Sequence, residues 1–167
     1  MSYDYGRKNW AEEEILRLAS LYGNGDYIQY VVLDENGNTL PQTKVYGLDK
    51  ISYPDIENEI DGILYMLIEV KSRGQFYKDN KFLALKEFAY RNYKRVQNEE
   101  KSDVRVVYLI GNKEEYELFW MDFAMFDEMK KHKEYFQDIN DKRASVYYFF
   151  HSSQLKTNAK NLFDIFE

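Results

Sequence analysis

The sequence contains no cysteine, only two prolines and two histidines, and no long hydrophobic run. Without cysteine the chain has no disulfide, thiolate nucleophile or zinc–thiolate site. His132 and His151 are far apart in the chain, so the sequence offers no histidine cluster for a metal. The longest apolar run, residues 63–68, is much shorter than the roughly 20 residues that span a membrane. We expect no membrane contact, and residues 1–10 carry no apolar secretion signal, which favours a cytoplasmic location.

Length and charge limit the number of domains and the kinds of partner that the protein can have. At 167 residues the chain has the usual length of one domain, so we expect a single domain over residues 1–167. Its net charge of −6 argues against nonspecific coating of nucleic acid, although a local basic groove is compatible with an acidic body. No Gly-x-Gly-x-x-Gly motif or phosphate loop lies between a strand and a helix, so nucleotide-cofactor and kinase chemistry are not expected.

Hydrophobic periodicity and turn residues predict a mixed α/β chain. Helices are expected over residues 10–21, 80–97, 113–136 and 154–166, and strands over 27–33, 43–48, 58–72 (a hairpin), 104–110 and 145–150. Asp79 or Asn80 is the expected cap of the second helix. Asn112, with Glu115 three positions later, has the capping-box pattern expected at the start of the third helix.

The most informative segment is the apolar hairpin predicted over residues 58–72, which contains few charged residues. Side chains alternate across a strand, so Glu69 and Lys71 point to the same face. A turn near Tyr65 would put Asp61 directly opposite Glu69. Like charges in such a pair are destabilising. A divalent cation between the two carboxylates would turn this repulsion into a binding site.

An acid-x-lysine triplet is not specific by itself, because the chain has four of them. Only Glu69-Val70-Lys71 ends an apolar strand and follows a nearby acid. The charges of this triplet could instead belong to an exposed hairpin face, on which Lys71 pairs with Glu59. Such a pair would stabilise the fold by under about 1 kcal/mol. The nearly continuous apolar flanks argue against it, because charges rarely lie on a strand buried on both sides without a partner.

Together, Asp61 and Glu69-Val70-Lys71, placed between two predicted helices, resemble the motif of the PD-(D/E)xK, or restriction-endonuclease-like, nucleases. The resemblance covers roughly residues 10–110. It implies an α/β fold with a mixed β-sheet flanked by helices, an α-β-β-β-α-β core with an extra N-terminal hairpin. Members of this superfamily resolve Holliday junctions, restrict DNA, process breaks or act as nuclease toxins.

The resemblance also implies a mechanism. Asp61, Glu69 and the backbone carbonyl of Val70 would bind Mg²⁺ or Mn²⁺, and Lys71 would orient the attacking water and help to deprotonate it. Mg²⁺ is indeed usually held by one or two carboxylates, with waters and phosphate oxygens as further ligands. The implied activity is metal-dependent hydrolysis of phosphodiester bonds.

The identity of the first acid is open, because Asp55 follows Pro54 and matches the Pro-Asp of the motif literally. Asp61 is preferred on the expected strand pairing, although no Gly, Asn or Pro lies at the turn expected near Tyr65. Some relatives carry a Gln-x-x-x-Tyr pattern after the triplet. Gln75 is present here, but Asp79 occupies the tyrosine position.

Relatives often take another acid from the first helix, and Glu14 is the best inward-facing candidate here. Glu12 lies at the edge of the apolar arc and Glu13 points away from it. The alternative is that Glu14 simply stabilises the first turn through the helix dipole.

Arg73 and Lys78 lie closest to the triplet and are the expected contacts to substrate phosphates. The basic run at residues 130–133 is expected to be a charge cluster at a helix C-terminus. DNA is the expected partner, with RNA as an alternative, and a homodimer is expected by analogy with relatives. A binding module that keeps the fold without turnover, either a subunit or an immunity-type protein, is the alternative to an enzyme.

Overall fold

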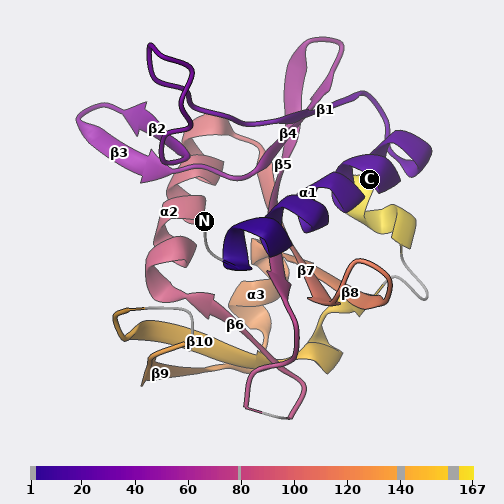
Figure 1. The fold of residues 1–167 in the computed structure, drawn as a ribbon, viewed down its shortest axis with the longest axis vertical. Coiled ribbons are helices and arrows are strands. Elements are labelled where there is room, and N and C mark those ends of the chain that lie inside the picture. The colour runs from indigo at the N-terminus through magenta and orange to yellow at the C-terminus, as the bar shows by residue number, and fades with distance from the viewer. Residues whose placement is uncertain (1–2, 79, 139–141, 158–161) are drawn as a thin grey trace.

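A six-stranded mixed sheet lies at the centre of the protein (Figure 1). The computed structural model describes residues 3–78, 80–138, 142–157 and 162–167. The strand order is β1-β4-β5-β7-β8-β11, with β5 and β7 parallel and the other pairs antiparallel. Its members are β1 (Asp26–Gln29), β4 (Ile56–Ile60), β5 (Ile63–Arg73), β7 (Asp103–Gly111), β8 (Tyr116–Asp122) and β11 (Lys156–Thr157). The predicted α/β class with a mixed, helix-flanked sheet is confirmed.

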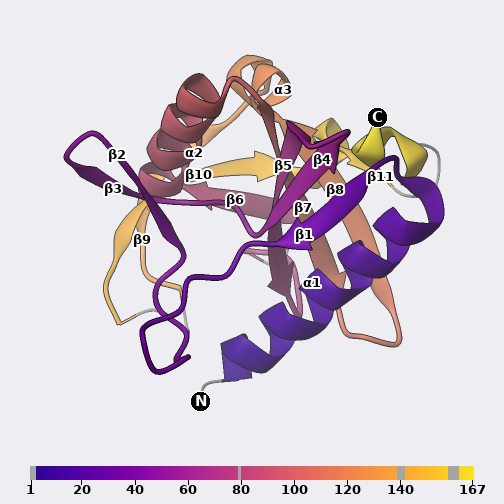
Figure 2. The ribbon, with the colours of Figure 1, turned by 90° about the horizontal axis from the view of Figure 1, so that it is seen from above.

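Helices cover both faces of this sheet (Figure 2). Helix α1 (Tyr3–Tyr22) lies across one face, while α2 (Glu87–Glu100) and the short α3 (Phe123–Glu128) lie on the other. Ala11 and Ile15 of α1 are fully buried against Ile68 of β5. None of the helices in the described ranges is long and apolar enough to span a membrane.

A smaller antiparallel sheet joins the α2 side of the molecule. It has the order β6-β10-β9, and Figure 1 shows it below α2. Its strands are β6 (Phe82–Lys86), β9 (His132–Phe136) and β10 (Ser145–His151). A separate hairpin, β2 (Thr43–Tyr46) and β3 (Asp49–Ser52), projects from the body. Two 3-10 helices, η1 (Ser152–Gln154) and η2 (Leu162–Phe166), complete the elements.

Three predicted helices differ from the structure. Residues 82–86 form strand β6 and α2 begins only at Glu87, while Asp79 lies outside the described residues. The helix expected over 113–136 is instead β8, α3 and β9, and the segment after Gln154 contains β11 and η2.

The signal at Asn112 explains the largest of these errors. Its side-chain oxygen accepts hydrogen bonds from the N–H groups of Glu114 and Glu115, as a helix cap would. Here this arrangement shapes the turn between β7 and β8, because Asn side chains stabilise turns by the same bonds. Short apolar runs do not distinguish a buried strand from a helix by periodicity alone. The helix expected over 10–21 and the strands expected over 104–110 and 145–150 are confirmed.

Gly25 connects α1 to β1 at a point where the chain touches β4. It has φ of +83°, and a Cβ atom there would collide with the backbone oxygen of Glu59. Gly37, in a surface turn, has the same φ of +83° but nothing within 4 Å of such a Cβ atom. A side chain would strain the backbone at both glycines, but it would collide with a neighbouring strand only at Gly25. Comparing the two positions therefore separates the cost of backbone strain from the cost of close packing.

Replacing Gly25 with alanine should lower the free energy of unfolding by at least about 1 kcal/mol more than replacing Gly37 with alanine. The strain of alanine at positive φ, roughly 1–2 kcal/mol, is common to both variants. Urea denaturation of both variants measures the difference. Equal losses would contradict the close approach of this connection to β4.

Candidate active site

The turn of the β4–β5 hairpin lies at Asp61 and Gly62. Ile60 pairs with Ile63, and the two turn residues have φ of 55° and 77°. Asp-Gly with two positive φ values is the preferred composition of a tight type I′ turn. The turn expected near Tyr65 is therefore wrong. Asp61 lies at the tip of the hairpin and is not opposite Glu69.

Asp55 is the acid that the register brings to Glu69. Ile56, the first residue of β4, pairs with Ile68, so the residue just before the strand continues the register to Glu69. Asp55 is fully buried, and its Oδ2 accepts a hydrogen bond from the backbone N–H of Val70 at 2.8 Å. Its Oδ1 accepts one from Nε2 of Gln42, also at 2.8 Å. Of the two candidates, Asp55 is next to the triplet and Asp61 is remote from it.

A β-bulge decides this outcome. The register shifts between Asn58 and Glu59, because Asn58 pairs with Met66 whereas Glu59 pairs with Leu64. Tyr65 of β5 is the unpaired residue. If it paired regularly with Asn58, the register set by the turn would place Asp55 opposite Ile68, on the α1 face. Bulges often re-aim a side chain beside a functional site. Asn58, fully buried, anchors the bulge by donating to the carbonyl oxygens of Asn24 and Asp26.

Glu69 and Lys71 lie on the same face of β5, as the alternation predicts. The Lys71 ammonium lies 3.0 Å from Oε2 of Glu69. Glu69 is 3% exposed, whereas the side chain of Lys71 is 38% exposed. The lysine therefore connects a buried carboxylate to solvent and offsets its charge, which reduces the cost of burying that charge.

Helix α2 closes this face with Tyr93. Its pKa is raised well above the usual tyrosine value, first by burial and then by the negative charges of Glu69 and Asp55. The Lys71 ammonium lies 5.9 Å from the centre of the same ring. Tyr93 therefore lies buried on the face of the sheet toward which Glu69 and Lys71 point.

Glu14 does not face this space. It forms an ion pair with Arg17 at 2.7 Å and accepts a hydrogen bond from the Tyr116 hydroxyl of β8. Its pKa is lowered, chiefly by the bond from Arg17. Glu14 thus joins α1 to β8. The prediction that Glu14 faces the site acids is therefore corrected.

Glu12, expected at the edge of the apolar arc of α1, is instead buried. It is 6% exposed and accepts a hydrogen bond from Nε2 of Gln29 at 2.8 Å. Gln29 pairs with Ile56, the residue directly after Asp55. Glu12 lies three residues before the core residue Ile15, which places it on the buried side of the helix. This spacing was the sequence signal that could have predicted its burial.

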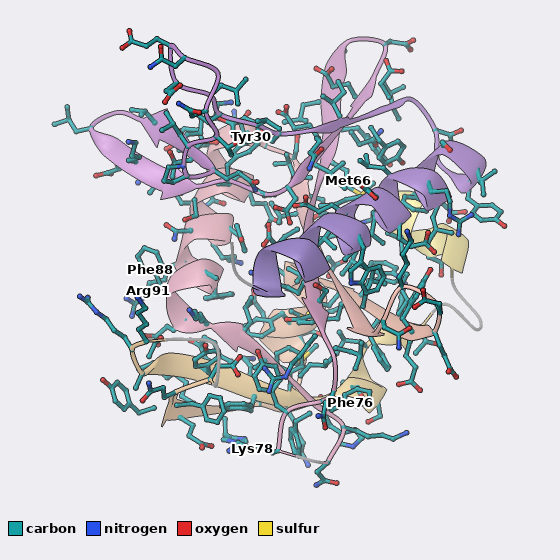
Figure 3. The ribbon with its side chains drawn as sticks, in the orientation of Figure 1. Tyr30, Met66, Phe76, Lys78, Phe88 and Arg91 are labelled. Atoms are coloured by element: carbon teal, nitrogen blue, oxygen red, sulfur yellow. The ribbon has the colours of Figure 1, made fainter. Side chains whose placement is uncertain are left out.

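The predicted phosphate contacts are engaged with acids. Arg73 donates twice to Asp138, at 2.7 and 2.8 Å, and lies 3.7 Å from the ring centre of Tyr77. Lys78 pairs with Glu134 beside the small sheet (Figure 3). Gln75 is exposed in the same loop. On α2, Arg91 points outward into solvent, as Figure 3 shows, and pairs with Glu87.

The described residues contain no group of three or more acids, histidines or cysteines able to hold a metal. A Mg²⁺ site here would therefore use two carboxylates, which is a usual number for this ion. Asp55 and Glu69 offer four carboxylate oxygens, and oxygen is the ligand atom that Mg²⁺ prefers. The donor set of Asp55 and Glu69 therefore fits an oxygen-preferring cation.

The mixed sheet flanked by helices defines a class of fold, the restriction-endonuclease-like architecture predicted from the sequence. A particular member is the structural neighbour Hjc, a Holliday junction resolvase from the archaeal hyperthermophile Archaeoglobus fulgidus. The TM-score is 0.53 at 13% sequence identity, covering 93% of this chain and 94% of the resolvase. No protein-family model and no curated protein matches the sequence. The comparison therefore establishes similarity of fold.

Replacing Asp55 with asparagine should lower the free energy of unfolding by roughly 1–3 kcal/mol, because an amide group would oppose a buried donor. Replacing Asp61 with asparagine should change it by less than about 0.5 kcal/mol, since Asn-Gly also favours this turn. Chemical denaturation at neutral pH in EDTA measures both. A larger loss for the Asp61 variant would reverse the assignment of the two acids.

Proposed function

We propose that the protein is a metal-dependent phosphodiesterase that cleaves DNA, with Asp55, Glu69 and Lys71 as its acting residues. The observation that carries this proposal is the β4–β5 register, which brings buried Asp55 to buried Glu69. Lys71 lies beside the pair and reaches solvent. The similarity of fold to a Holliday junction resolvase supports the same class of reaction.

Asp55 and Glu69 would hold Mg²⁺ or Mn²⁺ through their carboxylate oxygens, with the carbonyl of Val70 as a predicted further ligand. Such an ion, when bound, acidifies a coordinated water and offsets negative charge developing on a phosphate. Gln42 and the N–H of Val70 hold the Asp55 carboxylate in one orientation. This preorganisation removes the need to order the acid when substrate arrives.

Lys71 would position the attacking water and handle its proton. Its ammonium lies at the solvent side of the acids, where a phosphate can approach. A positioned acid–base group of this kind contributes roughly 10²–10⁴-fold to a rate. Glu14 is not part of this proposal, because Arg17 and Tyr116 bind its carboxylate away from the two acids.

DNA is the proposed substrate, and RNA is the alternative that the assay below tests. Lys78 stays a predicted phosphate contact, because its ion pair with Glu134 lies at the surface and surface pairs are weak enough to exchange partners. Arg73 is instead proposed to anchor the end of β5 through its paired bonds to Asp138. A homodimer stays a prediction.

One observation favours a binding module without turnover. Both acids already have partners in the structure, Asp55 through Gln42 and Val70 and Glu69 through Lys71. In a protein that only keeps the fold, these contacts would themselves be the role of the two acids. Metal binding therefore discriminates between the two functions.

Mg²⁺ or Mn²⁺ at about a hundred times its dissociation constant should stabilise the protein by roughly 2.7 kcal/mol. The shift should vanish in Glu69→Gln and Asp55→Asn but persist in Asp61→Asn. Thermal unfolding with and without EDTA measures it for each variant against its own baseline. An unchanged shift in Glu69→Gln would exclude this hairpin as the metal site, and no shift in the unaltered protein would favour the binding module.

The test of catalysis is incubation with plasmid, four-way DNA junctions, single-stranded DNA and RNA in Mn²⁺. The unaltered protein should cleave a DNA substrate, and Lys71→Ala should reduce the rate by at least about a hundredfold. Lys113→Ala, a change of the same charge in the exposed β7–β8 turn, is the control and should keep full activity. Cleavage unaffected by Lys71→Ala would point to another site or a contaminant, and cleavage of RNA alone would change the substrate class.

A further inference from the structure

A hollow of about 910 Å³ lies at one end of the small sheet. It is lined by the start of β6, the end of β10, η1 and the segment that leads from α3 into β9. Strand β9 begins at His132, opposite Phe149, so the last residues of β10 lie beyond its reach. The Gln154 side chain spans this gap by bonding to both N–H and C=O of Lys130. None of the lining residues belongs to β4 or β5, so the hollow is separate from the proposed cleavage site.

The charge of this hollow is opposite to that of the whole chain. Among the residues that the structure describes, the lining has three lysines, two histidines and no acidic residue, although the chain carries a net charge of −6. The basic residues are Lys130, Lys131, His132, Lys133 and His151. The run at 130–133 was expected to end a helix, but α3 ends at Glu128 and the run instead forms one wall. A local positive surface on an acidic protein attracts anions.

Two of the lysines are available to a ligand. The Lys133 ammonium pairs with Glu87 at 2.9 Å, but its side chain is 56% exposed. Exposed pairs contribute little and exchange partners readily. Lys130 is exposed and forms no ion pair among the described residues. Lys131 is less available to a ligand, because its ammonium donates to backbone carbonyls at the end of α3. Its Nζ lies 2.8 Å from the carbonyl oxygen of Phe126.

The same hollow presents aromatic rings beside its cations. The His132 ring stacks on Phe149 at 5.6 Å between centres, with the planes 22° apart, and His132 is itself exposed. Phe82 lies edge-on to both His132 and His151. Flat rings next to a positive groove are the pattern that binds single strands, because every base offers a face for stacking.

We propose that this hollow binds a single strand of nucleic acid. Lys130 and Lys133 would contact successive phosphates, and a base would stack on the outer face of His132. This binding goes beyond the proposed cleavage reaction and does not require it. In a nuclease it would hold a displaced or unpaired strand away from the acids.

The test is binding of a fluorescein-labelled oligothymidylate, followed by anisotropy in EDTA so that cleavage plays no part. The double variant Lys130→Gln/Lys133→Gln should weaken binding about tenfold at low salt and reduce the salt slope by about 1.4, at roughly 0.7 per phosphate contact on a single strand. The double variant Lys50→Gln/Lys113→Gln changes net charge equally at exposed positions outside the hollow, and should weaken binding less than about twofold.

Stacking has its own matched pair on β9. His132→Ala should weaken oligothymidylate binding roughly fivefold. Tyr135→Ala removes a 73% exposed ring of the same strand outside the hollow and should have little effect. Thermal unfolding of each variant shows whether it is folded.

Each outcome decides the proposal. Equal losses in the two lysine variants, or no binding by the unaltered protein at low salt, would overturn it. Polyphosphate that competes as well as oligothymidylate, or tighter binding of duplex, would exclude a single strand as the ligand. Selective loss in the hollow variants together with absent cleavage in Mn²⁺ would support the hollow and refute only the proposed nuclease.

Discussion

The register between β4 and β5 is the constraint on which the candidate site depends. Two features hold it, the Asp61–Gly62 turn at one end and the bond from the Val70 N–H to Asp55 at the other. The bulge beside Asn58 reconciles them. A slip of one residue would move the acid of β4 to the opposite face of the sheet, because strand side chains alternate.

Burial of the acids is offset by partners from several parts of the chain. Gln42 precedes the β2–β3 hairpin, Lys71 lies on β5 and Tyr93 comes from α2. Segments far apart in the sequence therefore meet at one end of the β4–β5 pair. A buried charge is stable only when such partners are present. The same partners hold the acids in position for chemistry.

The sequence was sufficient for features that depend on local pattern. The apolar β-branched run at 104–110 and the alternation of Glu69 and Lys71 are local, and both are found as predicted. The helix predicted over 80–97 failed in its first part, and the one predicted over 113–136 failed in most of its length, because their apolar spacing is also compatible with strands. The neighbouring strands of the small sheet, from residues 82–86 and 145–151, resolve that ambiguity. Likewise, the capping pattern at residues 112–115 predicts hydrogen bonds that a turn and a helix start share, so it could not distinguish the two.

Local pattern was enough to predict that the chain is mixed α/β and carries Glu69 and Lys71 on one face of an apolar strand. The sequence also contained both Asp55 and Asp61, and local pairing rules placed Asp61 opposite Glu69. The fold places Asp55 there, because the bulge is stabilised by Asn58 bonding to the end of the α1–β1 connection. The contacts of Glu12 and Glu14 are also tertiary, since Gln29 and Tyr116 reach these acids from distant strands. A face on a helix or strand is a local property, whereas what that face meets is not.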